Sequence, residues 1–386
     1  MPHSRRQFLS RGLALGCSAA ASPLLTPVTF AAAPGNARLV VIVLRGAMDG
    51  LDVVRPVFDG ALKTHRPDMD MREGLPLSDG FRLHPALDAL APLWRAGELS
   101  FAHAVSTPYR DKRSHFDGQD MLETGGMTVH GQRDGWLNRA LALVPGVETE
   151  TAFAIGRERM MLLSGSAPSA AWSPDGDLAL SPQARLLLDL IYAGDPLFSD
   201  AADEALALSD MTDPMAMGGG RGGATASLAQ FAAERLRAET RIAAFSINGW
   251  DTHARQSDAL PRALGDLSTA ILTLRDGLGP VWGKTTVLCL TEFGRTVTGN
   301  GTGGTDHGTG GAAIFAGGAL RGGAVLGKWP GLSENALYQR RDLMPTDDVR
   351  RYAAWALFAA LPVSRSDLMA QVFPGLEMGG DVGLTA

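Results

Sequence analysis

Five short segments of this sequence carry side chains that could do chemistry. Histidines, carboxylates and a serine recur in them within a few residues of one another, as in Ser-His, Asp-x-His and Asp-His. The segments are 45–50, 113–117, 248–253, 291–296 and 304–308. Imidazole nitrogens and carboxylate oxygens bind zinc and other divalent ions, and hydroxyl and imidazole groups act as nucleophiles, acids and bases. If the fold brings the segments together, the sequence predicts a metal-dependent site.

The candidate residues divide by their chemistry into three groups. The candidate metal ligands are Asp49, Asp251, His253, Glu292, Asp306 and His307. The candidate catalytic residues are Ser114, His115 and Arg295, and the candidate substrate-binding residues are Arg45 and Arg113. A serine at a helix start lies beside oriented backbone N–H groups, a histidine can protonate a leaving group, and arginine clamps an oxyanion with two hydrogen bonds.

Taken singly, each segment also has a purely structural interpretation. Asp49 precedes a glycine, which is typical of turns, and Ser114 is a typical helix N-cap. Glu292 and Arg295 are spaced for a salt bridge within one loop. An Asp-x-His sequence such as that starting at Asp251 more often caps a turn than binds a metal. The metal site is therefore predicted from the joint occurrence of the segments.

The elements that must position these segments alternate between apolar strands and long helices. Strands are predicted over 39–44, 99–105, 242–247, 285–290 and 312–316. Helices are predicted over 84–98, 181–192, 226–240 and 257–278, with a last one capped by Thr346 and ending near 361. This alternation favours an α/β fold with a parallel sheet covered on both faces. In such sheets ligands bind beyond the carboxyl ends of the strands, where the candidate segments lie.

Residues 1–33 have the features of an export signal. A basic run with paired arginines at 5–9 precedes a moderately apolar stretch at 12–30 and three alanines at 31–33. Paired arginines followed by Phe-Leu resemble the bacterial twin-arginine signal, which implies the twin-arginine export machinery as a partner and a periplasmic or secreted protein. A basic amphipathic helix and a lipoprotein-type signal at Cys17 remain alternatives.

Residues 34–386 are predicted to form a single domain, with a flexible Gly/Met-rich loop near 209–226 that is a linker, a lid or a plain surface loop. The net charge of −6 argues against non-specific nucleic-acid binding. No apolar run is long enough for a transmembrane span in the mature chain. Two cysteines, one of them in the leader, exclude a disulfide framework.

Jointly, the motifs resemble the domain-of-unknown-function 1501 family over nearly the whole mature chain. The motifs lie at 44–51, 83–87, 114–117, 134–137, 249–253, 292–296, 304–308 and 329–331. The fold of this family is thought to be similar to that of the alkaline phosphatase and sulfatase superfamily. The resemblance therefore implies an alkaline phosphatase-like, three-layer α/β/α sandwich with a mostly parallel central sheet. In active relatives it implies an ester hydrolase with two metal ions.

The resemblance also assigns roles, with one departure. It implies metal ligands at Asp49, Asp251, His253 and His307, and a nucleophile at Ser114. Where relatives carry an Asp-His pair, this chain has Glu292 and Phe293, so one imidazole ligand is missing. Fewer nitrogen ligands favour a harder ion or a single metal over two zinc ions. The expected cofactor is one or more divalent ions, namely Zn, Mn, Mg or Ca.

The predicted function is an exported, metal-dependent hydrolase of a phosphate or sulfate ester, with a small molecule or a glycan as substrate and Ser114 as nucleophile. Two alternatives stay open. One is a non-catalytic exported binding protein on the same fold, because a fold alone does not establish activity. The other is a metal-independent hydrolase using Ser114, His253 and Asp251, although no Gly-x-Ser-x-Gly sequence surrounds the serine.

Overall fold

The computed structural model describes residues 35–156, 160–172 and 221–385, which belong to one compact unit. The predicted export signal, the predicted helix at 181–192 and most of the Gly/Met-rich loop lie outside the described residues. Among the described residues, no helix is both long and apolar enough to cross a bilayer.

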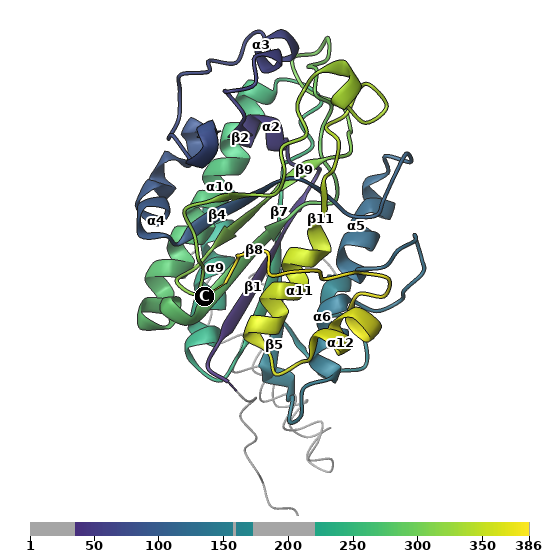
Figure 1. The fold of residues 1–386 in the computed structure, drawn as a ribbon. Helices are drawn as coiled ribbons and strands as arrows, with labels where there is room; N and C mark the ends of the chain where they lie inside the picture. The colour runs from purple at the N-terminus through teal and green to yellow at the C-terminus, as the bar shows by residue number, and fades with distance from the viewer. Residues whose placement is uncertain (1–34, 157–159, 173–220, 386) are drawn as a thin grey trace, which may run out of the picture. The chain divides into compact units, whose positions relative to one another are not determined.

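A nine-stranded sheet forms the centre of this described part of the chain (Figure 1). Its strands are β10 (Val325–Leu326), β4 (Leu99–Ser106), β9 (Gly311–Ala316), β8 (Thr285–Leu290), β1 (Arg38–Arg45), β7 (Ile242–Asn248), β5 (Ala152–Ile155) and β6 (Ala170–Trp172), in that spatial order, with β11 (Asp347–Asp348) also paired to β4. All described pairings in it are parallel except those of β9 with β4 and β8. The prediction of a mostly parallel sheet is therefore confirmed.

Helices cover both faces of this sheet, because alternate side chains of β1 enter two different hydrophobic cores. Val40, Ile42 and Leu44 pack with α9 (Arg221–Arg237) and α10 (Gln256–Leu278), and Leu39, Val41 and Val43 pack with α6 (Trp136–Ala142) and α11 (Val349–Ala360). A strand with an apolar residue at every position is what a sheet buried on both faces requires. The result is the predicted three-layer α/β/α arrangement (Figure 1).

Shorter elements connect these layers. The α-helices are α2 (Gly50–Val53), α3 (Ala61–His65), α4 (Ala91–Ala96), α5 (His115–Thr124) and α12 (Arg365–Asp367). The 3₁₀ turns are η1 (Ser78–Gly80), η2 (Pro85–Leu90), η3 (Thr149–Thr151), η4 (Met161–Leu163), η5 (Gly279–Lys284) and η6 (Glu334–Ala336), and η7 (Leu368–Val372) is a π turn. Two further strands, β2 (Val54–Arg55) and β3 (Arg82–Leu83), form a small antiparallel ribbon.

The prediction of one continuous helix over 84–98 is wrong. The structure has a 3₁₀ turn, η2, followed by the short helix α4. Pro92 lies at the start of α4 and has no N–H to donate to a carbonyl in the preceding turn, so a single α-helix cannot run through. Gly97 ends α4 in the left-handed conformation, with φ of 72°.

Two other helix starts differ from their predictions. The last helix, α11, begins at Val349 and is capped by Asp348, whose carboxylate accepts the N–H of Arg350. Thr346 instead donates its hydroxyl to the carbonyl of Lys328. The other helix, α9, begins at residue 221, so the end of the Gly/Met-rich stretch is helical; packing of its later residues outweighs the low helix propensity of its glycines.

The candidate segments meet at one edge of the sheet. In the parallel register of β1 and β7, Arg45 pairs with Asn248, so both strands end together. Strand β8 is also parallel to β1 and ends at the same edge, while antiparallel β9 begins there at Gly311. The loops after β1, β7 and β8 and the loop before β9 are therefore neighbours, as the parallel-sheet rule predicts.

Candidate metal centre

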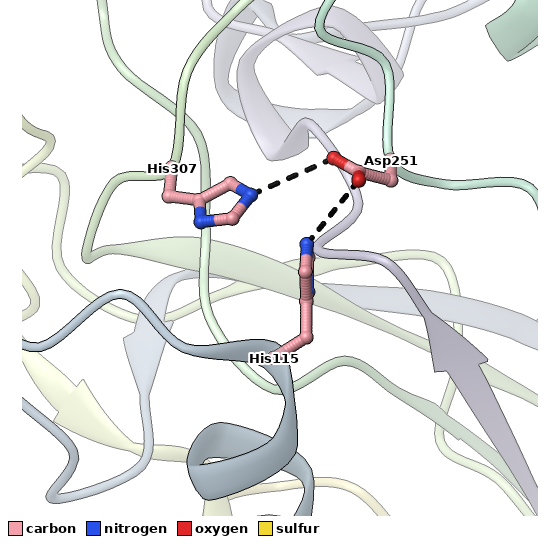
Figure 2. A group of neighbouring side chains, drawn as sticks. All are labelled: His115, Asp251 and His307. Atoms are coloured by element: carbon pink, nitrogen blue, oxygen red, sulfur yellow. Dashed lines mark ion pairs between the residues drawn. The ribbon is translucent and has the colours of Figure 1, made fainter.

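His115, Asp251 and His307 form a group whose possible ligand atoms all lie within 4.8 Å of one another. His115 is the first residue of α5, Asp251 follows β7, and His307 precedes β9. The two oxygens of Asp251 lie 3.5 Å from Nε2 of His115 and 3.6 Å from Nε2 of His307. Figure 2 shows both imidazole rings directed at the one carboxylate. Three distant segments thus converge on one point.

His253 adds a fourth donor on the open side of this group. Its Nε2 lies 2.8 Å from Nε2 of His307 and 3.2 Å from Oδ1 of Asp251. Ligands at about 2.0–2.1 Å from a tetrahedral zinc ion lie about 3.3 Å from each other. The observed separations lie on both sides of that value, so the spacing of the donors suits a small divalent ion.

The far nitrogen of each imidazole is anchored on an acceptor. The Nδ1 atoms of His115, His307 and His253 lie 2.8, 2.8 and 3.1 Å from the carboxylate of Glu292, the backbone carbonyl of Arg113 and the carboxylate of Asp306. In a neutral ring Nδ1 must then carry the proton, which leaves a lone pair on Nε2 directed towards Asp251. Such anchoring of the second nitrogen is typical of histidines that bind metals.

One of these lone pairs is unsatisfied. The Nε2 atom of His115 is buried and has no hydrogen-bond partner within the described part of the chain. A buried polar atom without a partner is rare in folded proteins and needs an explanation. A cation beside Asp251 would supply one, so the residues present fit a metal ion.

Arg295 fixes the charge of Asp251. Its guanidinium is fully buried and donates to Oδ1 of Asp251 at 2.5 Å. Its other acceptors are the backbone carbonyls of Gly46, Ala47, Trp250 and Thr305, at 2.6 to 3.1 Å. Burial alone would raise the pKa of Asp251, but the hydrogen bond and the charge of Arg295 outweigh it and lower the pKa. Asp251 is therefore a carboxylate, and Arg295 is enclosed by protein acceptors.

Glu292 is an orienting group beneath the site. It is fully buried, and its Oε1 accepts from His115, from the N–H of Gly46 at 2.9 Å and from Gln119 at 3.2 Å. Burial works to raise the pKa of Glu292, yet these hydrogen bonds, that of His115 foremost, lower it. The same bond raises the pKa of His115, whereas burial lowers the pKa of His307. Glu292 thus holds His115 in place.

Phe293 occupies the place at which the family resemblance implies an imidazole ligand. Its buried ring stacks on His115 with centroids 5.2 Å apart and lies equally close to the ring of His307. Gly118 of α5 permits this packing, because a Cβ at that position would lie 2.9 Å from the phenyl ring. The missing ligand is therefore replaced by an apolar support for two of the remaining histidines.

Asp49 is not brought into this group. It is 1% exposed, caps α2, and its Oδ2 lies 2.7 Å from both Nη1 of Arg66 and Nε2 of Gln256. Burial favours a raised pKa for Asp49, but the charge and hydrogen bond of Arg66 reverse the direction and lower it. The structure makes Asp49 part of a closed ion pair.

The other two predicted arginines are engaged by protein groups. Arg45 forms a 2.7 Å ion pair with Glu123 and donates to Gln119 at 2.8 Å. Arg113 contributes its carbonyl to His307, while its side chain lies 3.8 Å from Asp342.

Ser114 and Asp306 have supporting places. The hydroxyl of Ser114 caps α5 by accepting the N–H of Asp117 at 3.4 Å. Asp306 accepts from Nδ1 of His253 and, at 3.0 Å, from Asn300. The hydrogen bond of Asn300 is the main cause of the lowered pKa of Asp306.

A cavity of about 540 Å³ opens beside the metal-binding group and shares His115 and Asp251 with it. Sequence reasoning did not select several residues that matter here as site residues. They are Gln119, Glu123, Arg66, Gln256 and Asp342. Gln119, Glu123 and Gln256 follow candidate segments by a few residues, and that position is their one detectable signal.

The sequence matches the family described as "Protein of unknown function (DUF1501)" over residues 95–349. This range contains His115, Asp251, Glu292 and His307, whereas Asp49 precedes it. No curated protein matches the sequence.

Several solved structures are similar to this chain. One is the lipoteichoic acid synthase LtaP from Listeria monocytogenes, at 11% identity and a TM-score of 0.33; the match covers 69% of this chain and 58% of that chain, less than two thirds of its length. A Vibrio parahaemolyticus protein in the alkaline phosphatase superfamily has 14% identity, a TM-score of 0.33 and coverages of 80% and 69%. The C-terminal periplasmic domain of EcEptC from Escherichia coli, in complex with Zn, has 8% identity, a TM-score of 0.31 and 74% of each chain covered. At these values the similarity says nothing about activity.

Proposed function

Because this chain belongs to the DUF1501 family of proteins of unknown function, we propose its activity from the site: a hydrolase of phosphate or sulfate esters with a divalent metal ion bound by His115, Asp251 and His307. One observation carries the proposal. The anchored imidazoles turn their Nε2 lone pairs towards a single carboxylate. His253 is the proposed fourth donor, on the same evidence.

A cation satisfies this arrangement better than a proton does. The Nε2 atoms of His253 and His307 are 2.8 Å apart, and two facing lone pairs at that distance repel each other. A proton between them would satisfy that pair alone and leave Nε2 of His115 without a partner. A bound divalent ion would polarise an ester oxygen and lower the pKa of a bound water molecule.

We propose one metal ion here, where two occur in the superfamily that the sequence resembles. Arg295 places a buried positive charge next to Asp251, among four backbone carbonyls. The carboxylate of Asp49 is neutralised by Arg66. Both guanidinium groups therefore occupy positions near carboxylates where a second cation would otherwise be required.

In the proposed reaction a water oxygen forms a bond to phosphorus or sulfur and the bond to the ester oxygen breaks. The departing alkoxide takes up the proton that the attacking water releases and becomes an alcohol. The N-terminus of α5, which begins at His115, favours the negative charge of the ester group. The cavity beside it receives the alcohol part. Water is the proposed nucleophile, because the hydroxyl of Ser114 caps α5 and is not among the residues that line the cavity.

Export remains part of the proposal. The paired arginines at the N-terminus support passage through the twin-arginine machinery to the periplasm or beyond. A domain that must close four donors around an ion is suited to a route that carries folded proteins.

Elemental analysis of the purified protein tests the metal site. We expect about one divalent ion per chain in the wild type and none in His307→Ala. His130→Ala is the matched control, because His130 is 77% exposed and 3.9 Å from its nearest acid, Asp120; it should keep the metal. A wild type that binds no metal after incubation with Zn, Mn, Mg and Ca salts would contradict the proposal.

Hydrolysis of 4-nitrophenyl phosphate, 4-nitrophenyl sulfate and bis(4-nitrophenyl) phosphate tests the activity. We expect turnover of at least one ester that stops on chelation and returns with the metal. A metal-loaded protein without turnover on any ester would favour the non-catalytic binding protein. Turnover that survives chelation would favour the metal-independent hydrolase.

A further inference from the structure

We propose, building on the hydrolase function above, that the alcohol part of the substrate is a carbohydrate whose ring packs on Phe116. A cavity lies beside the metal-binding group. It has a volume of about 540 Å³, within the range of small-molecule sites, and His115 and Asp251 are among the residues that line it. A group seated there lies next to the reacting atoms.

Phe116 is the most exposed large apolar side chain in the described part of the chain. It is 84% exposed, against 49% for Phe58, 48% for Met127 and 41% for Phe358. It directly follows His115 in the first turn of α5 and lines the cavity. An aromatic ring left open to water at the mouth of a site provides a flat surface for a ligand.

Most of the other side chains that line the cavity are polar, namely those of Arg45, Gln119, Asp120, Glu123 and Asn248. Arg45 bonds to Gln119 and Glu123, so these three form a hydrogen-bonded wall. The carboxylate of Asp120 is 41% exposed and can accept hydrogen bonds from neighbouring hydroxyl groups. A sugar ring has this same division: C–H bonds on its face, suited to the negative face of an aromatic ring, and hydroxyl groups around its edge.

Other alcohols fit this wall less well. An alkyl chain needs a continuous apolar groove, but only Phe116 and Met161 supply large apolar side chains here. A nucleobase is typically held between apolar surfaces on both faces, and Phe116 offers one. Arg45 neutralises Glu123, so the exposed carboxylate of Asp120 adds negative charge on this side, which suits a neutral polyol better than a second anionic group.

The test compares alcohols within two sets of esters, phosphates and sulfates, so that each comparison keeps the reacting group constant. The substrates are glucose 6-phosphate, N-acetylglucosamine 6-sulfate, glycerol 1-phosphate, adenosine 5′-monophosphate and dodecyl sulfate. We expect the highest kcat/KM with a sugar ester. Phe116→Ala should lower kcat/KM about 3- to 10-fold more for sugar esters than for glycerol 1-phosphate, while Phe116→Trp retains the sugar preference.

Phe358→Ala is the matched control, since Phe358 is also exposed but belongs to α11. It should change none of the rates. Equal loss on sugar and glycerol esters in Phe116→Ala, or none, overturns the inference. So does a preference for the nucleotide or for dodecyl sulfate, although the hydrolase function would then stand.

Binding gives a readout that does not depend on turnover. Saturation-transfer NMR with methyl glucoside and N-acetylglucosamine should show contact signals with wild type and Phe358→Ala, and weaker ones with Phe116→Ala. If no ester is hydrolysed, the proposed function fails by itself, and these signals still decide the inference. Absence of contact with both sugars in the wild type overturns it.

Discussion

Asp49 and Asp251 start from the same sequence pattern, a carboxylate placed just beyond a buried parallel strand, and end in opposite states. Asp251 is 47% exposed, and its oxygens face the Nε2 atoms of anchored histidines. Asp49 is 1% exposed and is enclosed by Arg66 and Gln256. A carboxylate at a strand end becomes a candidate ligand only where no cationic side chain closes over it completely.

The arginines make the difference in both regions. Arg66 donates to Asp49 and to the carbonyls of Thr296 and Val297, so its side chain covers the carboxylate of Asp49. Arg295 takes only one oxygen of Asp251 and otherwise binds backbone carbonyls. Oδ2 of Asp251 is left to face His115. The first region is a structural ion pair, and the second keeps donors available for an ion.

The largest effect is expected in the closed region, which consists of Asp49, Arg66 and Gln256. Asp49→Asn removes the charge that compensates buried Arg66, and breaking such a pair costs about 3–5 kcal/mol of unfolding free energy. Urea unfolding at pH 7 measures it. Metal content should stay at about one ion per chain.

Asp251→Asn is the converse variant. It should lose the metal with a smaller loss of stability, because Asp251 is half exposed and Arg295 keeps its four carbonyl acceptors. Loss of metal in Asp49→Asn with unchanged stability would reverse the assignment of the two regions.

The sequence predicted that both carboxylates lie at the same edge of the sheet. It did not predict that an arginine encloses one of them and leaves the other open. Continuous apolar runs such as 39–44 and 285–290 identify buried strands, and the rule for parallel sheets then places the polar loops at one edge. What separates the regions is a long-range contact. Arg66 comes from an irregular segment after α3 whose composition carries no periodic signal.

Backbone groups are a second reason why the sequence could not predict the whole site. The carbonyl of Arg113 anchors His307, and its position depends on the left-handed conformation of that residue, with φ of 54°. Side-chain chemistry suggested an anion clamp at Arg113. No pattern of residue types reveals that its carbonyl oxygen will be used, so the orienting contacts had to come from the structure.

The buried histidine His103 makes the stability of the fold depend on pH. His103 is enclosed by the carbonyl of Val54 and the N–H of Ala104, and burial lowers its pKa from 6.5 to about 4. Between these values the unfolded chain binds more protons than the folded one, so stability falls as the pH drops. The loss approaches about 1.4 kcal/mol per pH unit and totals about 3 kcal/mol.

Urea unfolding between pH 7 and pH 4, with His103→Gln alongside, measures this contribution. Above pH 6.5 both proteins should show no dependence on this group. Below it, the wild type should lose stability faster than the variant, by about the amount given above. Parallel curves for the two proteins would show that His103 does not remain neutral in the folded state.

In the open region, which consists of Asp251 and the histidines around it, loss of the orienting carboxylate of Glu292 should lower the metal affinity more than the stability of the fold. Glu292→Gln weakens the anchor of His115, and loss of such a contact typically lowers metal affinity about 10- to 100-fold. Competition with a chromogenic chelator measures the dissociation constant. Glu123→Gln is the control, because Glu123 is a buried carboxylate at the same cavity that pairs with Arg45 and not with a histidine. Equal losses in both variants would mean that general charge, and not the anchor, sets the affinity.

The smallest effect concerns Ser114, which is half-buried and caps α5 as Asp49 caps α2. Its hydroxyl accepts the N–H of Asp117, so Ser114→Ala should cost about 1 kcal/mol of unfolding free energy. Turnover should stay unchanged if water is the nucleophile. Ser114→Asn separates cap from nucleophile, since asparagine caps a helix well, adds no charge and has no hydroxyl. That variant should keep both stability and turnover. If both variants lose turnover while Ser114→Asn stays as stable as wild type, the hydroxyl attacks the ester, and the site works through a covalent intermediate.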